Sequence, residues 1–241
     1  MNHNTTARMV SLWPSHVLMD QLDELNDIRD TLALEAERFS ERHTRKDAKM
    51  AHRADTVSMM REQPSAALLR LLSCIEQRLE TYLQLGYPAL DTSQLAITYN
   101  TFVNRQRGLG KWAIPHRHVG NQLVATYYAR VHFGPGEGAD EVGMPGALCF
   151  HDPRPVQANW MLRHENKLFA QTPLPGTLFI FPGYLEHSTF PMFDRESDKI
   201  AIVTNVRFTH QDDSGGDMAW AADQLRAHAS NAGLDAGGQH G

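Results

Sequence analysis

After Leu90 the sequence changes from helical periodicity to a series of short runs rich in β-branched and aromatic residues. Glycine, proline and polar residues separate these runs, a pattern typical of many short strands joined by turns. Because such strands follow a helical segment, we predict an α+β fold whose β part is a sandwich or jelly roll. The predicted strands are 95–104, 123–131, 147–150, 177–181 and 200–208.

The segment before the strands indicates two helices. From Ser15, leucine and isoleucine recur every three or four positions up to Leu32, and Ser15 is placed to cap that helix, which fades after Phe39. A second helix is predicted from about Ser65 to Leu85, with Ser65 as its cap and Gly86 at its end. We expect both helices to pack outside the β part.

No change in composition marks a domain boundary, so we predict a single domain over residues 1–241. Its helical N-terminal part is 10–90 and its β core is 91–210. The C-terminal part, 211–241, is predicted to hold one short helix at 217–229 followed by a disordered, glycine-rich tail.

Charge and cysteine content exclude several classes of protein. A formal net charge of −5 argues against nucleic acid as a partner, because phosphate binding needs a basic surface. Cys74 and Cys149 lie in helical and strand patterns, so we expect both to be reduced and buried. We see no signal-peptide pattern and no apolar run of about 18 residues, so we expect a cytoplasmic protein without a membrane partner.

Three histidines near predicted strands form a candidate metal site. His116 and His118 are two residues apart, a spacing that places both side chains on one face of an extended chain. His187 follows another predicted strand about seventy residues later. With 13 histidines in the chain, a His-x-His pair alone often arises by chance. The shared strand context, and a basic residue a dozen positions beyond His187, favour a divalent metal held by all three imidazoles.

Several ordered motifs resemble those of the iron(II)/2-oxoglutarate-dependent oxygenases, most closely a bacterial and phage group with a His-x-His…His motif. The matching segments lie between about residues 10 and 208. They are Leu12-Trp13-Pro14, His116-Arg-His118 with Tyr127-Tyr128, Gly146-Ala-Leu-Cys-Phe-His-Asp-Pro-Arg154, Phe181-Pro-Gly-Tyr-Leu-Glu-His187 and Lys199-Ile-Ala-Ile-Val-Thr-Asn205.

The resemblance implies a double-stranded β-helix, a cupin-like jelly roll, with a metal at its open end. It implies Fe(II) as the metal and 2-oxoglutarate as the cosubstrate. His116 and His187 match the two histidine ligand positions of the family. His118 falls where most of the superfamily has Asp or Glu, so here the expected ligand set consists of three imidazoles.

The resemblance also implies a basic residue on the last strand that pairs with the distal carboxylate of 2-oxoglutarate. Lys199 stands at the start of that strand, and Arg195 is the competing candidate. We favour Lys199 because it adjoins the strand residue Ile200. Lysine acts as a point charge, whereas arginine offers two parallel hydrogen bonds.

Three polar residues complete the predicted cosubstrate site. Asn104 and Asn205 match asparagines of the family, and hydrogen bonds to 2-oxoglutarate or a structural role in strand ends both fit them. Tyr127 is the third candidate. Since Tyr127 and Tyr128 alternate faces, one of them is expected to contact the cosubstrate while the other packs.

The activity implied by the resemblance is hydroxylation of an unactivated C–H bond with release of succinate and carbon dioxide. The expected partners are O2 and a small-molecule, amino-acid or peptide substrate, and a homodimer is compatible with the sequence. Two alternatives are a cupin-type three-histidine dioxygenase that does not use 2-oxoglutarate, and a non-catalytic cupin-like metal- or ligand-binding protein. Lys199 and the Phe-Pro-x-x-Leu-x-His context favour the first interpretation.

Overall fold

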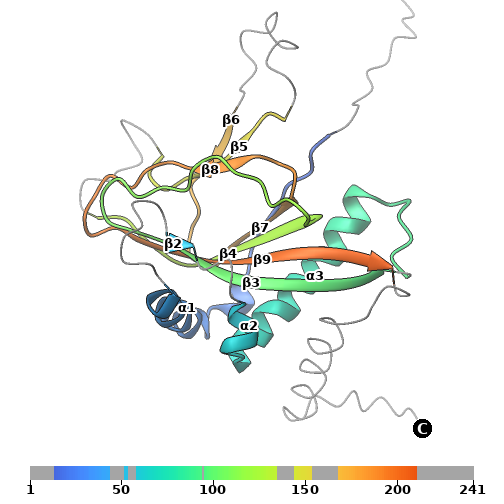
Figure 1. The fold of residues 1–241 in the computed structure, drawn as a ribbon, viewed down its shortest axis with the longest axis horizontal. Helices are drawn as coiled ribbons and strands as arrows, with labels where there is room; N and C mark the ends of the chain where they lie inside the picture. Colours follow the sequence, from blue (N-terminus) through green and yellow to red (C-terminus); the bar gives the residue numbers. More distant parts are fainter. Residues whose placement is uncertain are drawn as a thin grey trace, which may run out of the picture.

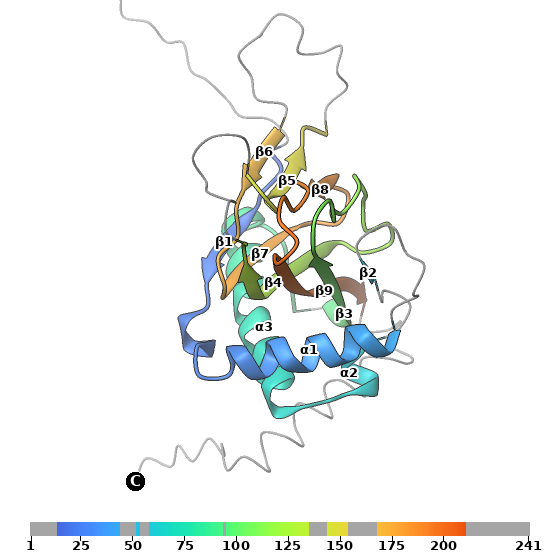
Figure 2. The same ribbon diagram turned by 90° about the vertical axis from the view of Figure 1, so that its left-hand side faces the viewer.

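A computed structural model describes residues 14–43, 52–53, 58–93, 95–134, 144–153 and 168–210. In this part of the chain, two antiparallel sheets face each other and helices cover the outer side of the larger sheet (Figures 1 and 2). None of the helices described is both long and apolar enough to cross a membrane.

The larger sheet has six strands, in the order β1-β7-β4-β9-β3-β2. Their bounds are β1 Leu18–Gln21, β7 Thr177–Pro182, β4 Leu123–His132, β9 Asp198–His210, β3 Leu95–Arg107 and β2 His52–Arg53. The smaller sheet has three strands in the order β6-β5-β8, with bounds Leu168–Gln171, Leu148–His151 and His187–Thr189. All five predicted strands are present, and the two antiparallel sheets agree with a sandwich or jelly roll.

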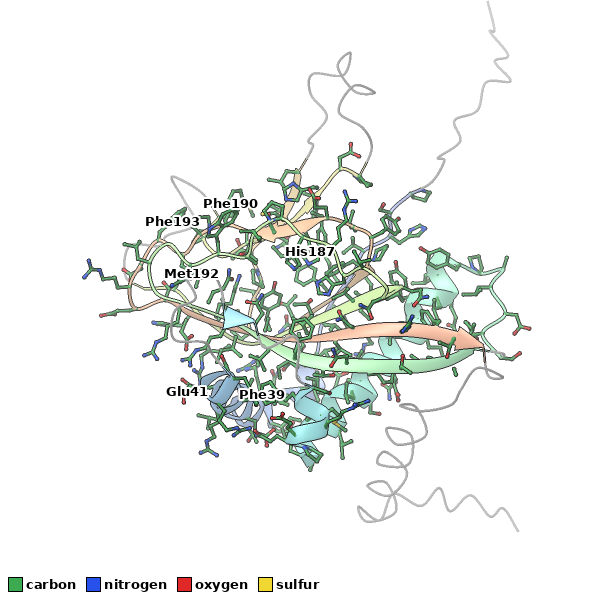
Figure 3. The ribbon with its side chains drawn as sticks, in the orientation of Figure 1. Phe39, Glu41, His187, Phe190, Met192 and Phe193 are labelled. Carbon is green, nitrogen blue, oxygen red and sulfur yellow. The ribbon has the colours of Figure 1, made fainter. Side chains whose placement is uncertain are left out.

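Among the described residues, three α-helices and one 3-10 turn lie against the outer face of the larger sheet (Figure 1). Side chains on α1, such as Phe39, point toward that sheet (Figure 3). The bounds are η1 Asp23–Leu25, α1 Arg29–His43, α2 Met59–Glu62 and α3 Ala66–Gly86. The prediction of a helix from Ser65 is confirmed, because α3 begins at Ala66 and the Ser65 hydroxyl accepts a hydrogen bond from Leu68 N–H at 3.0 Å.

The alternation of side chains along the strands builds two separate apolar layers. One layer packs between the larger sheet and the helices, and its sheet residues are Val103, Leu123, Ala125, Tyr127, Ala129, Leu178, Ile180, Ile200, Ile202 and Val206. The other lies between the two sheets and consists of Phe102, Val124, Tyr128, Leu148, Phe150, Phe179, Phe181, Leu185, Ala201 and Val203. Successive residues of β4, β7 and β9 therefore pack into different apolar layers.

The helix predicted from Ser15 to about Phe39 is wrong in its first part. Leu18–Gln21 forms β1, which pairs with β7 and alternates between partly buried and exposed side chains. Leu22 is buried in the helix-side layer without helical structure, and Leu22 N–H donates to Gly176 O at 3.0 Å. Pairing with a sheet edge thus replaced local helical hydrogen bonds, and the helix begins only at Arg29.

Candidate metal centre

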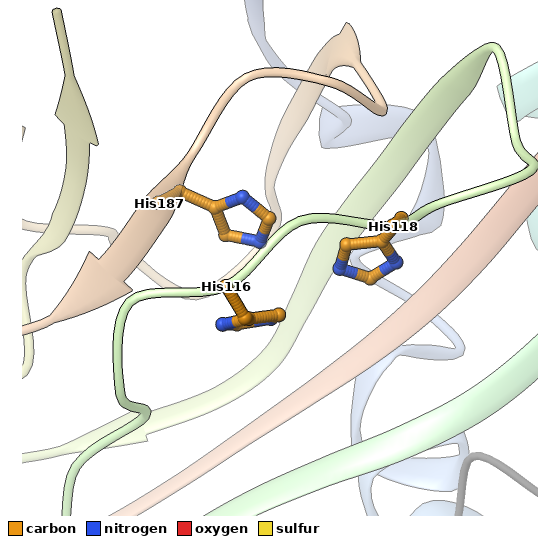
Figure 4. Close-up of side chains that lie close together, drawn as sticks. All are labelled: His116, His118 and His187. Carbon is orange, nitrogen blue, oxygen red and sulfur yellow. The ribbon is translucent and has the colours of Figure 1, made fainter. Parts of the chain in front are cut away.

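Three histidine rings converge at one end of the space between the two sheets (Figure 4). The ligand atoms that His116, His118 and His187 contribute all lie within 4.8 Å of one another. The ring centroids are 4.3 Å apart for His116 and His187, 5.1 Å for His118 and His187, and 5.2 Å for His116 and His118. Three imidazoles at this separation can share one divalent ion and leave coordination positions for other ligands.

Backbone hydrogen bonds bring the two distant segments together. His116 N–H donates to His187 O and His187 N–H donates to His116 O, each at 3.0 Å, which makes a single antiparallel bridge. His118 N–H donates to Gly183 O at 2.9 Å. His116 and His118 thus lie ahead of β4 rather than inside a strand, and the bridge to the first residue of β8 sets their register.

Hydrogen bonds to the rings select the tautomer that a metal requires. Each Nδ1 lies close to an oxygen that can only accept, so Nδ1 donates and a neutral ring carries its lone pair on Nε2. Such second hydrogen bonds also orient metal-binding imidazoles. The acceptors are Ile114 O for His116 at 2.7 Å, Asn205 Oδ1 for His118 at 2.5 Å and Leu185 O for His187 at 2.9 Å.

Aromatic packing holds two of the rings in place. His118 and His187 are each 5% exposed, whereas His116 is half-buried at the rim. Phe102 stacks on His118 with 6.2 Å between centroids, and Phe181 meets His187 edge to face at 4.7 Å. The inner rings are therefore shielded from water, and His116 marks the open side of the cluster.

A cavity extends from the histidines toward β3 and β9. Its lining includes all three histidines and the side chain of Lys199. The remaining lining residues are Phe102, Asn104, Gln106, Ala113, Thr126, Tyr128, Leu148, Thr189, Ala201 and Val203. None of these cavity-lining residues carries a carboxylate, so the described wall of the cavity favours an anionic ligand.

Lys199 is the buried cation of this cavity. It is 2% exposed, its ammonium donates to Gly146 O, and Nζ lies 5.6 Å from the centre of the Tyr128 ring. Burial lowers the pKa of Lys199 to about 7, because an ammonium away from water is costly. Arg195, the competing candidate, is exposed in the loop between β8 and β9 and does not line the cavity.

Of the three polar residues predicted to contact the cosubstrate, only one lines the cavity. Asn104 lines the cavity, whereas Asn205 contacts the ring of His118 and so orients a histidine. Tyr127 packs against the helices on the opposite side of the sheet, and its neighbour Tyr128 lines the cavity. The prediction that Tyr127 faces the site is therefore wrong, because the inner face of β4 carries Tyr128 instead.

Gln106 and Thr189 also line the cavity, and neither is among the predicted site residues. Gln106 shares the cavity-facing side of β3 with Asn104, two residues earlier, so strand alternation contained the signal. Thr189 lies two residues after His187 on β8, and the same alternation applies to it. Neither residue belongs to a motif, so only the pairing of the strands shows that both reach the cavity of Lys199.

No known protein-family model matches the chain, and a search of curated protein sequences found no significant match. Solved structures do match its fold. A prolyl hydroxylase from Trichoplax adhaerens, in complex with a hypoxia-inducible-factor peptide, has a TM-score of 0.53 at 14% identity, covering 88% of this chain and 86% of that one. A 2OG-Fe(II) oxygenase family oxidoreductase from Burkholderia pseudomallei has a TM-score of 0.50 at 10% identity, covering 78% and 84%.

A third similar structure is HygX from Streptomyces hygroscopicus, solved with nickel and 2-oxoglutarate bound. Its TM-score is 0.50 at 12% identity, and the match covers 79% of this chain and 83% of that chain. This chain therefore has the fold of the 2-oxoglutarate–Fe(II) oxygenases, and three of its histidines lie together in that fold.

Proposed function

We propose that the protein is an Fe(II)- and 2-oxoglutarate-dependent oxygenase with the fold of a double-stranded β-helix. His116, His118 and His187 hold the metal, and Lys199 pairs with the distal carboxylate of 2-oxoglutarate. The observation that carries the proposal is one cavity, in this fold, lined by three converging imidazoles and by a buried ammonium.

The donor set fits a divalent iron. Neutral imidazoles are good ligands for Fe(II), and the Nδ1 hydrogen bonds direct all three lone pairs to Nε2. Three neutral ligands leave the metal charge uncompensated, so an anionic co-ligand is favoured. The keto-acid end of 2-oxoglutarate supplies that anion, while its other carboxylate matches Lys199.

Each of the chain's own groups has a defined task in this proposal. Asn205 holds the ring of His118 through its Oδ1, and the aromatic rings of Phe102 and Phe181 keep water from the inner imidazoles. Lys199 orients the cosubstrate so that its keto acid faces the histidines. When bound, the iron with 2-oxoglutarate activates O2, and a substrate C–H bond is hydroxylated as 2-oxoglutarate becomes succinate and carbon dioxide.

The substrate enters from the side of His116, the most exposed of the three histidines. We propose a small molecule, an amino acid or a peptide as the substrate class, with hydroxylation as the outcome. The similar Trichoplax adhaerens hydroxylase was solved with a peptide, which supports including peptides in a substrate screen.

Anaerobic titration with Fe(II) and 2-oxoglutarate tests the proposal directly. We expect a metal-to-ligand charge-transfer absorption band in the wild type, and its loss in both His187→Ala and Lys199→Ala. Arg195→Ala is the matched control and should keep the band, since Arg195 is an exposed basic residue outside the cavity. Circular dichroism should show that all variants are folded.

Three outcomes separate this function from its rivals. Absence of the band, together with no succinate formed under oxygen, would overturn the proposal. Full iron occupancy in His187→Ala would show that the ligand set is different. Iron binding and oxygen consumption that do not depend on 2-oxoglutarate or on Lys199 would identify a three-histidine dioxygenase instead.

A further inference from the structure

We propose that Gln106 is the second group that binds the distal carboxylate of 2-oxoglutarate, through a side-chain N–H oriented by Thr189. This inference rests on the proposed function and adds a specificity-determining residue to it. Gln106 is 1% exposed and lines the same cavity as Lys199.

Strand register places Gln106 beside Lys199. In the antiparallel pair of β3 and β9, Gln106 lies directly opposite Lys199. Side chains of directly opposed residues leave the sheet on the same face, with Cβ atoms about 5 Å apart. Both side chains line the cavity, so a carboxylate that reaches the ammonium of Lys199 also comes within reach of the amide of Gln106.

Thr189 forms a short hydrogen-bonded chain with this amide. Thr189 Oγ1 accepts two hydrogen bonds, one from Ala113 N–H at 2.8 Å and one from Gln106 Nε2 at 2.6 Å. In this arrangement Gln106 Oε1 is buried without a hydrogen-bond partner among the described residues. A buried amide oxygen without a donor is costly, and a half-turn of the amide that brings Oε1 to the Thr189 hydroxyl relieves it.

A half-turn of the amide about its terminal bond would give Gln106 Oε1 a donor and free Nε2 for a ligand. Thr189 Oγ1 would still accept from Ala113 N–H, and the Thr189 O–H would donate a hydrogen bond to Gln106 Oε1. Gln106 Nε2 would then take the position that Oε1 holds and donate to a ligand. The two ends of an amide have nearly the same shape, so the turn needs no extra space.

The chemistry of Lys199 explains why a second donor is useful. An ammonium is a point charge and lacks the two parallel donors with which arginine grips a carboxylate. The Lys199 ammonium also donates to Gly146 O, which occupies one of its three protons. A directed N–H from Gln106 supplies the second contact to the carboxylate, so the pair recognises a dicarboxylic keto acid over a monocarboxylic one.

The test compares two keto acids that differ only in the distal carboxylate. Anaerobic Fe(II) protein is titrated with 2-oxoglutarate and with 2-oxopentanoate, and the charge-transfer band reports both affinities. We expect Gln106→Leu to reduce the preference for 2-oxoglutarate by about 10-fold or more, the effect of losing one hydrogen bond to a charged group. Gln106→Glu should reduce it further, because its charge repels the ligand and pairs with Lys199.

Thr101→Val is the matched control, since it also removes a buried polar group from β3. The Thr101 hydroxyl bonds Thr204 at 3.1 Å and does not line the cavity, so the preference should stay unchanged. Thr189→Val removes the orienting hydroxyl and should lower the preference by a smaller factor than Gln106→Leu. It also serves as the second variant should Gln106→Leu fail to fold.

A second readout does not depend on affinity. In the 15N–1H spectrum of Zn(II)-loaded protein, the side-chain amide signal that is missing from Gln106→Leu should shift with 2-oxoglutarate and remain in place with 2-oxopentanoate. If the wild type binds neither keto acid, the proposed function itself fails. If the wild type prefers 2-oxoglutarate and both Gln106→Leu and Thr189→Val keep that preference, only the role of Gln106 is refuted.

Discussion

Burial and a bound carboxylate have opposite effects on the charge of Lys199. In the cavity its burial lowers the pKa to about 7, so near neutral pH the ammonium is close to losing its charge. A bound carboxylate would restore the charged form, because an opposite charge at short range favours ionisation. Occupancy of the proposed cosubstrate site and protonation of Lys199 are therefore linked.

This linkage predicts a pH dependence of 2-oxoglutarate binding. Above pH 7 the empty site has lost the Lys199 proton, so binding must take one up and the Kd should rise about tenfold per pH unit. The anaerobic charge-transfer titration between pH 7 and 9 measures this slope. Lys199→Arg should flatten it, since arginine stays charged over that range. The same steep slope in Lys199→Arg would assign the effect to another group.

At the scale of elements, the turn between β7 and β8 controls how the histidines meet. A Cβ added to Gly183 would overlap Asn121 O and would lie 3.0 Å from His118 O. Both are backbone oxygens of the loop that carries His118, so they cannot swing aside as the end of a long side chain can. Glycine at this position allows the two metal-binding segments to approach each other.

We predict that Gly183→Ala weakens metal binding about tenfold or more, because it pushes the His118 loop away from the turn that leads to His187. Competition with a chelator of known affinity measures the change. Gly86→Ala is the control. A Cβ at Gly86 would lie 3.3 Å from the side chain of His16, which is not a residue of the metal site. Equal metal affinity in the Gly183→Ala and wild-type proteins would contradict this account of the turn.

At the scale of the whole molecule, a network of ion pairs joins α1 to the central strands. Arg105 on β3 contacts Glu37 of α1 at 2.5 Å and Asp198 of β9 at 2.9 Å. Arg130 on β4 contacts the same Glu37 at 2.9 Å and the same Asp198 at 3.0 Å. The network lies on the helix-facing side, one residue from Gln106 and Lys199, so it anchors the strand ends that form the inner cavity.

The network predicts a loss of stability in acid. Burial opposes ionisation of Asp198, but the hydrogen bonds and charges of Arg105 and Arg130 outweigh it and lower the Asp198 pKa. The pKa of Glu37 is lowered in the same way. A carboxyl with a lowered folded-state pKa stabilises the protein above its unfolded pKa of about 4, and that stability is lost as the pH falls further.

Urea unfolding at pH 7, 5, 4 and 3 measures the effect. We expect the free energy of unfolding of the wild type to fall most steeply below about pH 4. Asp198→Asn should be less stable at pH 7 by about 2–4 kcal/mol, since it leaves two partly buried guanidinium groups underpaired, and should show a weaker dependence on pH. A wild-type stability that stays constant down to pH 3 would show that the network contributes little.

Much of this fold follows from local patterns in the sequence. The β-branched and aromatic runs correspond to β3, β4, β5, β7 and β9, and the serine before an amphipathic run marks the start of α3. The two-residue spacing of His116 and His118 predicts that both rings reach one site, and the predicted strand ahead of His187 marks it as the third histidine of that site. These features depend on side-chain periodicity and capping, which short stretches of sequence encode.

Tertiary structure alone decided the remaining points. The Leu18–Gln21 segment is a strand because it pairs with β7. Tyr128 rather than Tyr127 reaches the cavity because the helices cover the other face of the sheet. Alternation in a strand separates two faces but does not say which one is inside. The pairing of Gln106 with Lys199 depends on the register of β3 against β9, which is set by contacts between residues far apart in the sequence.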